Sequence, residues 1–276
     1  MPSLLSDEAS QHGRKVRATR STTNTAGKST DAVAMAHAAG AQTEALRPAN
    51  VMERGRIQAL YNDVYWVQGE MPGYGNDHRR NMVIVRDGHQ LTLINPVRLS
   101  PLQERNLQYL GRIAHVLRLG DEPTADEHYY RSRYYAALWA LPGQVDKPRH
   151  NILKEDAPLP IAGARLLKLE HSRRSQAVLL LERHGLLLSD DLLQHYGNWQ
   201  NLSLKDQLLM RLQGFHKGMN LSRHWLRSAT AKDFSLKDDI QRILTLNFDA
   251  LLGASGTPMM LGAKQALHGE IDNVFH

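Results

Sequence analysis

The stretch that most constrains the fold is VLLLERHGLLLSDDLLQHY, residues 178–196. Two uninterrupted apolar runs, 178–181 and 186–188, predict β-strands that are buried on both faces. The histidine–glycine pair between them predicts a tight turn, since glycine adopts positive φ without strain. The second strand leads directly to Asp190 and Asp191. In layered α/β proteins, binding and catalytic groups usually gather at the carboxyl ends of strands.

The two carboxylates also have a purely structural interpretation. Asp190 or Asp191 would serve as the N-cap of a helix that begins at Leu192, because an aspartate at that position accepts hydrogen bonds from the first free N–H groups. His195 would then lie on a face of this helix, one turn further on. The sequence pattern alone leaves both interpretations open.

Composition narrows the possible chemistry. The 276-residue chain has no cysteine, so disulfides, thiolate nucleophiles and cysteine-ligated metals are excluded. The net charge is +6, but its 34 basic and 28 acidic residues are interspersed, so no nucleic-acid partner is expected. No apolar run is long enough for a bilayer and no signal-peptide core is present. We therefore expect a cytoplasmic protein that has no membrane partner.

The chain divides into a leader and one domain. Residues 1–50 are rich in small, polar and basic residues and contain no aromatic side chain. Such a segment buries too little apolar surface to offset its ordering entropy. We expect a disordered leader over 1–50 and a folded domain over 55–276.

Capping signals mark the expected helices of that domain. Ser100 before Pro101 predicts a helix over 101–110. Ser203 and Ser235 each begin a capping-box-like pattern, and replacing either by alanine is expected to cost about 1 kcal/mol. The leucine stripe after Ser203 is expected to face the core, and it comprises Leu204, Leu208, Leu212 and Phe215. A further helix is expected over 127–135, and strands over 63–67, 81–85, 91–94, 114–119, 137–141 and 165–169.

The order of these elements over residues 63–275 resembles the metallo-β-lactamase superfamily. Residues 186–191 resemble the strand that in this family ends in a metal-bridging aspartate, which would be Asp191. Residues 248–256 resemble the late strand that presents a histidine, and Ser255 stands in the histidine's place. The resemblance implies an α/β fold, an αββα four-layer sandwich in which two facing mixed β-sheets are flanked by helices.

The main metal motif of the family is eroded in this chain. The pattern H-x-H-x-D-H corresponds to residues that end at His128, with Pro123 and Ala125 at the first two histidines and Glu127 at the aspartate. Asp126 and Glu127, followed by two tyrosines, resemble a divergent bacterial branch of the superfamily. Alternatively, the two acids cap the helix that follows them.

The resemblance implies at most a partial metal site. His171 matches the family's next histidine ligand, so His128, His171 and Asp191 are the candidate ligands. These would hold no metal or one weakly bound zinc or iron ion, because a complete two-metal centre needs more ligands. Both histidines also have the alternative of being ordinary hydrogen-bonded residues. The residues expected to line the cleft are Asp126, Tyr129, Tyr130, Asp190, His195 and Ser255, with Trp199 beside them.

Two functions from different classes follow. The loss of three ligand positions favours a catalytically vacant scaffold that binds a small molecule or a protein partner in the old cleft. The alternative is a hydrolase of an ester, thioester or phosphoester that uses one metal ion to activate water. In that alternative Asp191 and Glu127 are the candidate catalytic residues.

Overall fold

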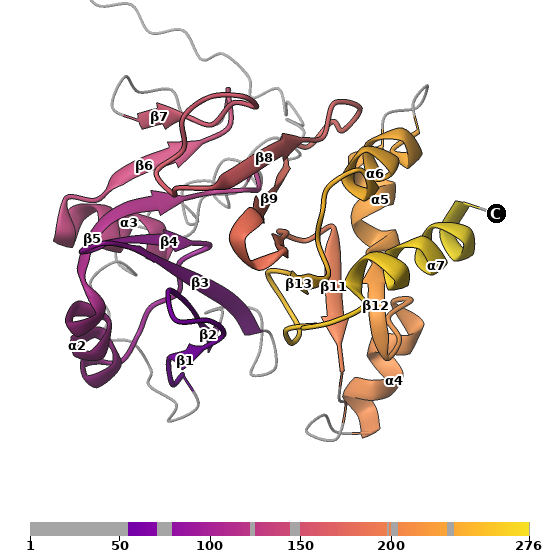
Figure 1. The fold of residues 1–276 in the computed structure, drawn as a ribbon. Helices are drawn as coiled ribbons and strands as arrows, with labels where there is room; N and C mark the ends of the chain where they lie inside the picture. The colour runs from indigo at the N-terminus through magenta and orange to yellow at the C-terminus, as the bar shows by residue number, and fades with distance from the viewer. Residues whose placement is uncertain are drawn as a thin grey trace, which may run out of the picture. The chain divides into compact units, whose positions relative to one another are not determined.

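The structure of the chain is a computed structural model that describes residues 55–70, 79–121, 125–143, 150–197, 199, 204–230 and 235–275 (Figure 1). The expected leader lies outside the described residues, as do Pro123 and Ser203. None of the described helices is long and apolar enough to cross a membrane.

Seven strands form one mixed sheet in which sequence neighbours are also neighbours in space. The first four strands pair antiparallel and the last four pair in parallel. Gly88, at φ 57°, lies in the tight hairpin between β3 and β4, where Asp87 pairs with Gln90. Parallel pairs need long crossovers, and helices α2 (Pro101–Leu110) and α3 (Ala125–Tyr134) lie in two of them. The strands are β1 (Gln58–Ala59), β2 (Val64–Glu70), β3 (Arg79–Asp87), β4 (Gln90–Ile94), β5 (Arg112–Leu117), β6 (Ala137–Ala140) and β7 (His150–Ile152).

The second sheet is built around the stretch 178–196. Its strand order is β13-β10-β9-β8, so β10 lies between two neighbours, antiparallel to β9 and parallel to β13. Leu187 packs toward the helices, whereas Leu186 and Leu188 pack toward the other sheet. This two-sided burial explains the uninterrupted leucine runs. The strands are β8 (Ala164–Lys168), β9 (Ala177–Leu181), β10 (Leu186–Leu188) and β13 (Ala250–Leu252).

The connection between β9 and β10 is longer than the predicted two-residue turn. Because Leu181 pairs with Leu186, the loop comprises four residues. Three of them form a 3-10 turn, Glu182–His184, and Gly185 closes it in the left-handed region at φ 55°.

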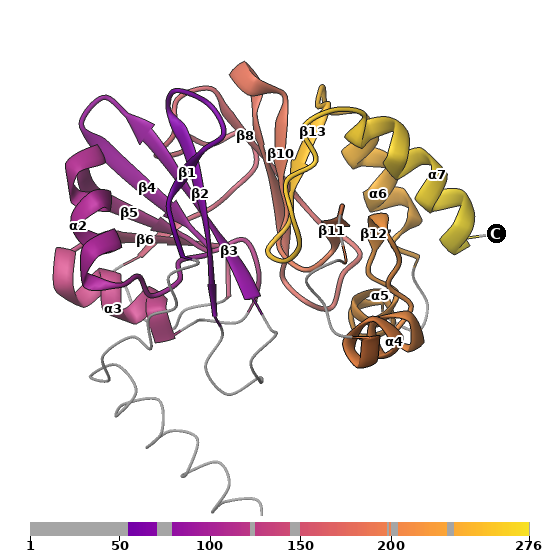
Figure 2. The same ribbon diagram turned by 90° about the horizontal axis from the view of Figure 1, so that it is seen from below.

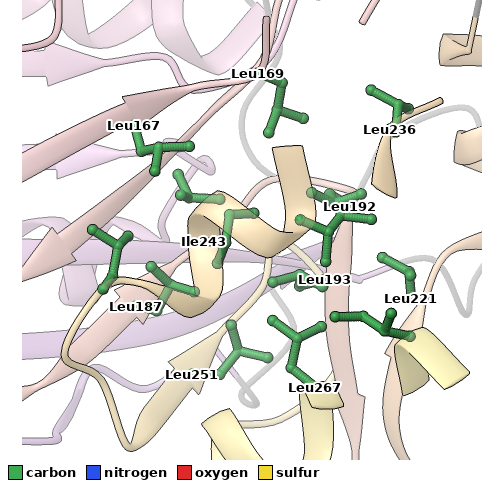
Figure 3. Close-up of a cluster of buried hydrophobic side chains, with 14 of the residues drawn as sticks. Leu167, Leu169, Leu187, Leu192, Leu193, Leu221, Leu236, Ile243, Leu251 and Leu267 are labelled. Atoms are coloured by element: carbon green, nitrogen blue, oxygen red, sulfur yellow. The ribbon is translucent and has the colours of Figure 1, made fainter. Parts of the chain in front are cut away.

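Three apolar clusters separate four layers (Figure 2). Leu107 and Tyr130 pack α2 and α3 onto the seven-stranded sheet, and Leu117 and Leu188 belong to the cluster between the two sheets. Ile243 belongs to the third cluster, which packs helices onto the four-stranded sheet (Figure 3). The structure therefore has the expected αββα order. The helices on this second side are α5 (Arg223–Ala229), α6 (Lys237–Leu244) and α7 (Ala263–Phe275).

The residues after Asp191 form a strand, so the helix-cap interpretation is wrong. β11 (Leu193–Tyr196) pairs antiparallel with β12 (Gly218–Leu221). His195 is consequently a strand residue and not a helix-face residue. A partner more than twenty residues away decides this conformation, and a local capping pattern carries no information about such a partner.

Helix α4 (Leu204–Leu212) turns its leucines outward. Leu204, Leu208 and Leu212 are exposed, so the expected inward stripe is wrong. Apolar periodicity identifies a face of a helix, but it does not identify what covers that face.

One predicted helix cap, that of Ser100, is present among the described residues, whereas the N-cap of α6 is Leu236 and not Ser235. Ser100 is the N-cap of α2, and its hydroxyl accepts a hydrogen bond from the Gln103 N–H at 3.1 Å. Ser235 lies one residue before the N-cap of α6, and its hydroxyl accepts a hydrogen bond from the Lys237 N–H at 3.1 Å. Both bonds satisfy backbone donors that have no partner within the helix.

Candidate functional site

Asp190 is the buried carboxylate at the end of β10, with only 5% of the residue exposed. It forms an ion pair with Arg80 near the start of β3, so the contact joins the second sheet to the first. Gly120, which follows β5, makes room for the pair. A Cβ at this glycine would overlap the Asp190 carboxylate.

Opposite charges alternate around this ion pair. The Asp191 Oδ1 lies 3.9 Å from an Nη of Arg80, and 42% of the Asp191 side chain is exposed. On the other side, Arg174 Nε donates to Asp121 Oδ2 at 3.0 Å. The group of Arg80, Asp190, Asp191, Asp121 and Arg174 is called the Arg80–Asp190 cluster below.

Burial raises the pKa of Asp190 from its ordinary value to about 7. The Arg80 guanidinium opposes this rise by favouring the charged form, whereas the nearby carboxylates of Asp191 and Asp121 reinforce it. A hydrogen bond with the buried Gln176 side chain favours the charged form. Asp190 therefore changes its charge close to neutral pH.

The loop after β13 is tied down beside the cluster. Ala254 N–H donates to the Asp190 carbonyl at 3.1 Å, and the Asn81 side-chain amide donates to the Gly253 carbonyl at 2.9 Å. Ser255, the residue in the position of the family's late histidine, lies partly exposed in this loop. His195 reaches the same loop, with its Nδ1 3.2 Å from the Thr257 carbonyl oxygen.

Glu127 and His128 have different surroundings although they are adjacent on α3. Glu127 is buried and accepts two hydrogen bonds from Arg118, at 2.8 and 3.1 Å. His128 is exposed, with its Nε2 3.3 Å from the Ser132 hydroxyl one turn on. Asp126 Oδ2 accepts from the Arg98 N–H at 2.8 Å. The two acids thus anchor α3 to the segment around Arg98 and Arg118.

The two tyrosines also have different positions. Tyr130 is fully buried in the core, where its hydroxyl donates to the Val97 carbonyl at 2.9 Å. Tyr129 is half-buried, donates to Glu104 at 2.6 Å and lies beneath the Arg98 guanidinium. Burial is the main cause that raises the pKa of both hydroxyls.

His171 is held by α6. The backbone N–H groups of Glu170 and His171 donate to the two carboxylate oxygens of the fully buried Asp239, at 2.9 and 2.8 Å. The His171 ring Nδ1 lies 3.4 Å from the same carboxylate.

Trp199 is buried, and the Arg211 guanidinium lies 5.6 Å from its ring centroid.

The predicted ligands do not form a common donor set. Among the residues that the structure describes, no three His, Asp or Glu side chains are grouped closely enough to hold a metal ion. His128 points to solvent on α3, His171 is tied to Asp239, and Asp191 lies beside the Arg80 guanidinium. Zinc takes about four tetrahedral donors at distances near 2.0–2.2 Å. The positions of His128, His171 and Asp191 do not provide such a donor set.

Arg80 and Arg174, the two basic residues of the cluster, were not predicted from the sequence. Arg80 immediately precedes the buried run 81–85, and a charge so close to a core strand requires a partner. Gly120 lies three residues after the end of β5 in a buried segment, where a missing side chain signals the close approach of another group. Asp239 gave no signal, because it lies among the charges of an ordinary amphipathic helix.

Comparison with known proteins identifies the fold. No protein-family model matches the sequence, and no curated protein matches it. Solved structures do match. A metallo-β-lactamase from Erythrobacter litoralis aligns with a TM-score of 0.53 and 14% identity over 85% of this chain and 99% of its own. The metallo-β-lactamase FIM-1 from Pseudomonas aeruginosa, in its mono-zinc form, gives 0.54 and 12% over 82% and 96%.

A β-lactamase domain protein from Burkholderia ambifaria is also similar, with a TM-score of 0.52 and 14% identity over 81% of this chain and 77% of its own. At these identities the likeness establishes the architecture and nothing about activity. The chain therefore has the metallo-β-lactamase fold.

Proposed function

We propose that the protein is a binding scaffold of metallo-β-lactamase fold that works without a metal centre and takes a small molecule or a protein partner. The Arg80–Asp190 ion pair carries this proposal. A buried carboxylate needs a compensating positive charge, and the Arg80 guanidinium supplies it from within the chain. A divalent cation on the same carboxylate would have to displace this guanidinium or lie against a like charge.

The other candidate ligands support the same proposal. Glu127 is engaged by Arg118, and His171 is positioned by Asp239. Recruiting them to a metal would require breaking hydrogen bonds to charged groups, each worth about 1.5–3 kcal/mol. They serve packing and anchoring in this arrangement.

One observation favours the alternative, a hydrolase with a single weakly held metal ion. Asp191 and His171 keep partly exposed side chains, so solvent reaches both. If a metal were recruited, they would be the accessible donors. The hydrolase alternative predicts that the protein binds a metal ion through Asp191, whereas the scaffold proposal predicts that it does not.

Elemental analysis decides between the two. The protein is produced without a histidine tag in medium supplemented with zinc, and zinc, iron and manganese are measured per chain. Asp191→Ala is the test variant, and Asp238→Ala, which removes an exposed carboxylate on α6, is the matched control.

The scaffold proposal predicts well under one metal ion per chain in all three proteins, because loss of even supporting residues weakens metal sites about 10–100-fold. Stoichiometric metal in the wild type and the control, lost in Asp191→Ala, overturns the proposal. A screen of ester, thioester and phosphoester substrates would then be the next step.

A further inference from the structure

The outer face of α2 exposes large side chains in a regular stripe. Leu102, Arg105 and Tyr109 are spaced three and four residues apart, so they lie on one side of the helix. Leu102 is 58% exposed and Tyr109 is 86% exposed. Leu107, on the opposite side, is fully buried against the sheet. The stripe therefore faces solvent, away from the core.

A second exposed tyrosine follows α3 in a strained conformation. Tyr135 is 92% exposed and has φ 55°, in the left-handed region. The position directly after a helix is commonly left-handed, and glycine is the residue that adopts this conformation without steric cost. A large side chain in a strained, exposed position is a recognised sign of a functional constraint.

The helix ends that precede the two tyrosines are joined to each other. The Gln108 amide donates to the Tyr134 hydroxyl at 2.8 Å, which joins the C-terminal turn of α2 to that of α3. Tyr109 directly follows Gln108 in the sequence, and Tyr135 directly follows Tyr134. Figure 2 shows the two helices side by side on the outer face of the first sheet. The surface formed by Leu102, Arg105, Tyr109, Arg133 and Tyr135 is called the Tyr109–Tyr135 face.

The acidic side chains of both helices turn inward from this face. Glu104 is buried and accepts hydrogen bonds from Tyr129 and Tyr134. Asp126 binds the Arg98 backbone and Glu127 binds Arg118. These three are the acids of α2 and α3.

The exposed charges of the face are consequently positive. Arg105 is exposed, and Arg133 remains 56% exposed although its Nε lies 3.0 Å from Glu104. The structure thus presents tyrosine and arginine together on one exposed surface.

We propose that the Tyr109–Tyr135 face is a docking surface for an acidic segment of a partner protein. Tyrosine and arginine are the residues most enriched among those that dominate protein–protein binding energy. Charge complementarity selects an acidic partner and steers its approach. The proposal goes beyond the binding scaffold proposed above, because it names a surface and a class of partner, and it does not depend on the Arg80–Asp190 cluster.

The charge count favours a protein over a nucleic acid as the occupant. A nucleic-acid site typically neutralises about 6–10 phosphates with basic side chains. Arg105 and Arg133 are the exposed arginines of the face, and they lie beside an exposed leucine, Leu102, that no phosphate backbone would use. An acidic peptide with apolar side chains matches both features.

The probe is a fluorescein-labelled peptide of alternating glutamate and leucine, and its binding to the full chain is measured by fluorescence anisotropy at low and high salt. The test variants are Tyr109→Ala, Tyr135→Gly and Arg105→Glu. Arg165→Glu makes the same charge change at an exposed residue of β8 and is the matched control. An oligothymidylate of equal charge and phosphatidylserine vesicles are parallel probes.

The peptide is expected to bind saturably, and each test variant is expected to weaken it about 10-fold or more, the loss that a dominant interface residue causes. The control should change affinity less than about 2-fold. Tyr135→Gly should raise the melting temperature while it weakens the peptide, because glycine relieves the left-handed strain. This opposite pair of effects separates loss of a contact from loss of folding.

Three outcomes overturn the proposal. The first is no saturable binding of the peptide. The second is an equal loss in Arg105→Glu and Arg165→Glu with none in the tyrosine variants, which would reflect net charge alone. The third is tighter binding of the oligonucleotide or the vesicles that disappears in the same three variants, which would assign the face to a nucleic acid or a lipid surface.

Discussion

Arg80 on β3 and Asp190 after β10 form a buried ion pair that connects the two sheets of the sandwich. The pair lies at the end of the second sheet where the resemblance to metallo-β-lactamases implies metal-binding residues. Gly120, in the loop after β5, leaves space for it, and Asp121 beside that glycine holds Arg174. This end of the sandwich is thus stabilised by charges that the chain itself provides.

Removing the arginine should destabilise the protein strongly. Arg80→Met removes the cation that compensates Asp190, and at a pH above about 7, where this carboxylate is charged, breaking a buried pair in this way costs about 3–5 kcal/mol. Urea unfolding measures the loss. Arg79→Met, at the neighbouring position, is the matched control and should cost under about 1 kcal/mol.

The double variant Arg80→Met with Asp190→Leu should recover part of the loss, because it removes both charges together. If the losses of Arg80→Met and Asp190→Leu simply add in the double variant, the two residues are not coupled as a pair. Equal losses in Arg79→Met and Arg80→Met would also contradict the assignment.

The protonation of Asp190 should make its contribution depend on pH. The ordinary pKa in the unfolded chain is about 3.9, and burial raises that of the folded state to about 7. Between these values the folded protein retains a proton that the unfolded chain has lost. Raising the pH therefore favours unfolding. The stabilisation from this group is complete below about pH 4 and is lost as the pH rises through about 7.

Asp190→Asn lacks this proton equilibrium, so its stability relative to the wild type should rise between pH 4 and pH 7, by at most about 1.4 kcal/mol per pH unit. Thermal melts of both proteins across this range give the difference. Asp238→Asn controls for the loss of a carboxylate on the surface. Parallel curves for wild type and Asp190→Asn would show that burial does not retain the proton.

The sequence predicted the layers well because the signals for them are local. The leucine runs of β9 and β10 are buried on both faces, and Ser100 with Pro101 marks the start of α2. The failures came from contacts distant in sequence. β12 converts the residues after Asp191 into a strand, and no described element covers the leucines of α4.

The site was harder to predict than the fold for a similar reason. A motif identifies the carboxylates Asp190 and Asp191, but it does not say which of the two is buried or which cation compensates it. Arg80 is 110 residues away from Asp190 in the sequence. Only the pairing of β2 with β3 and the packing of one sheet on the other bring it to that position.

Gly120 is the residue that accommodates the Arg80–Asp190 ion pair. A methyl group at Gly120 would overlap the Asp190 carboxylate, so Gly120→Ala must displace Asp190 from Arg80 or shift the β5 segment away. Overpacking in a well-packed interior costs about 1–3 kcal/mol, and disturbing the buried pair adds to this. Urea unfolding of Gly120→Ala, compared with Gly269→Ala, is the measurement.

Gly269→Ala is the contrasting variant, because a Cβ there meets nothing within 4 Å and the residue lies inside helix α7. Alanine at such a position should stabilise the protein by about 0.5–1 kcal/mol, since glycine loses more backbone freedom on folding. The same substitution should therefore have opposite effects at the two glycines. A Gly120→Ala protein as stable as the wild type would mean that Asp190 does not occupy the space beside Gly120. The Arg80–Asp190 pair would then have to be placed elsewhere.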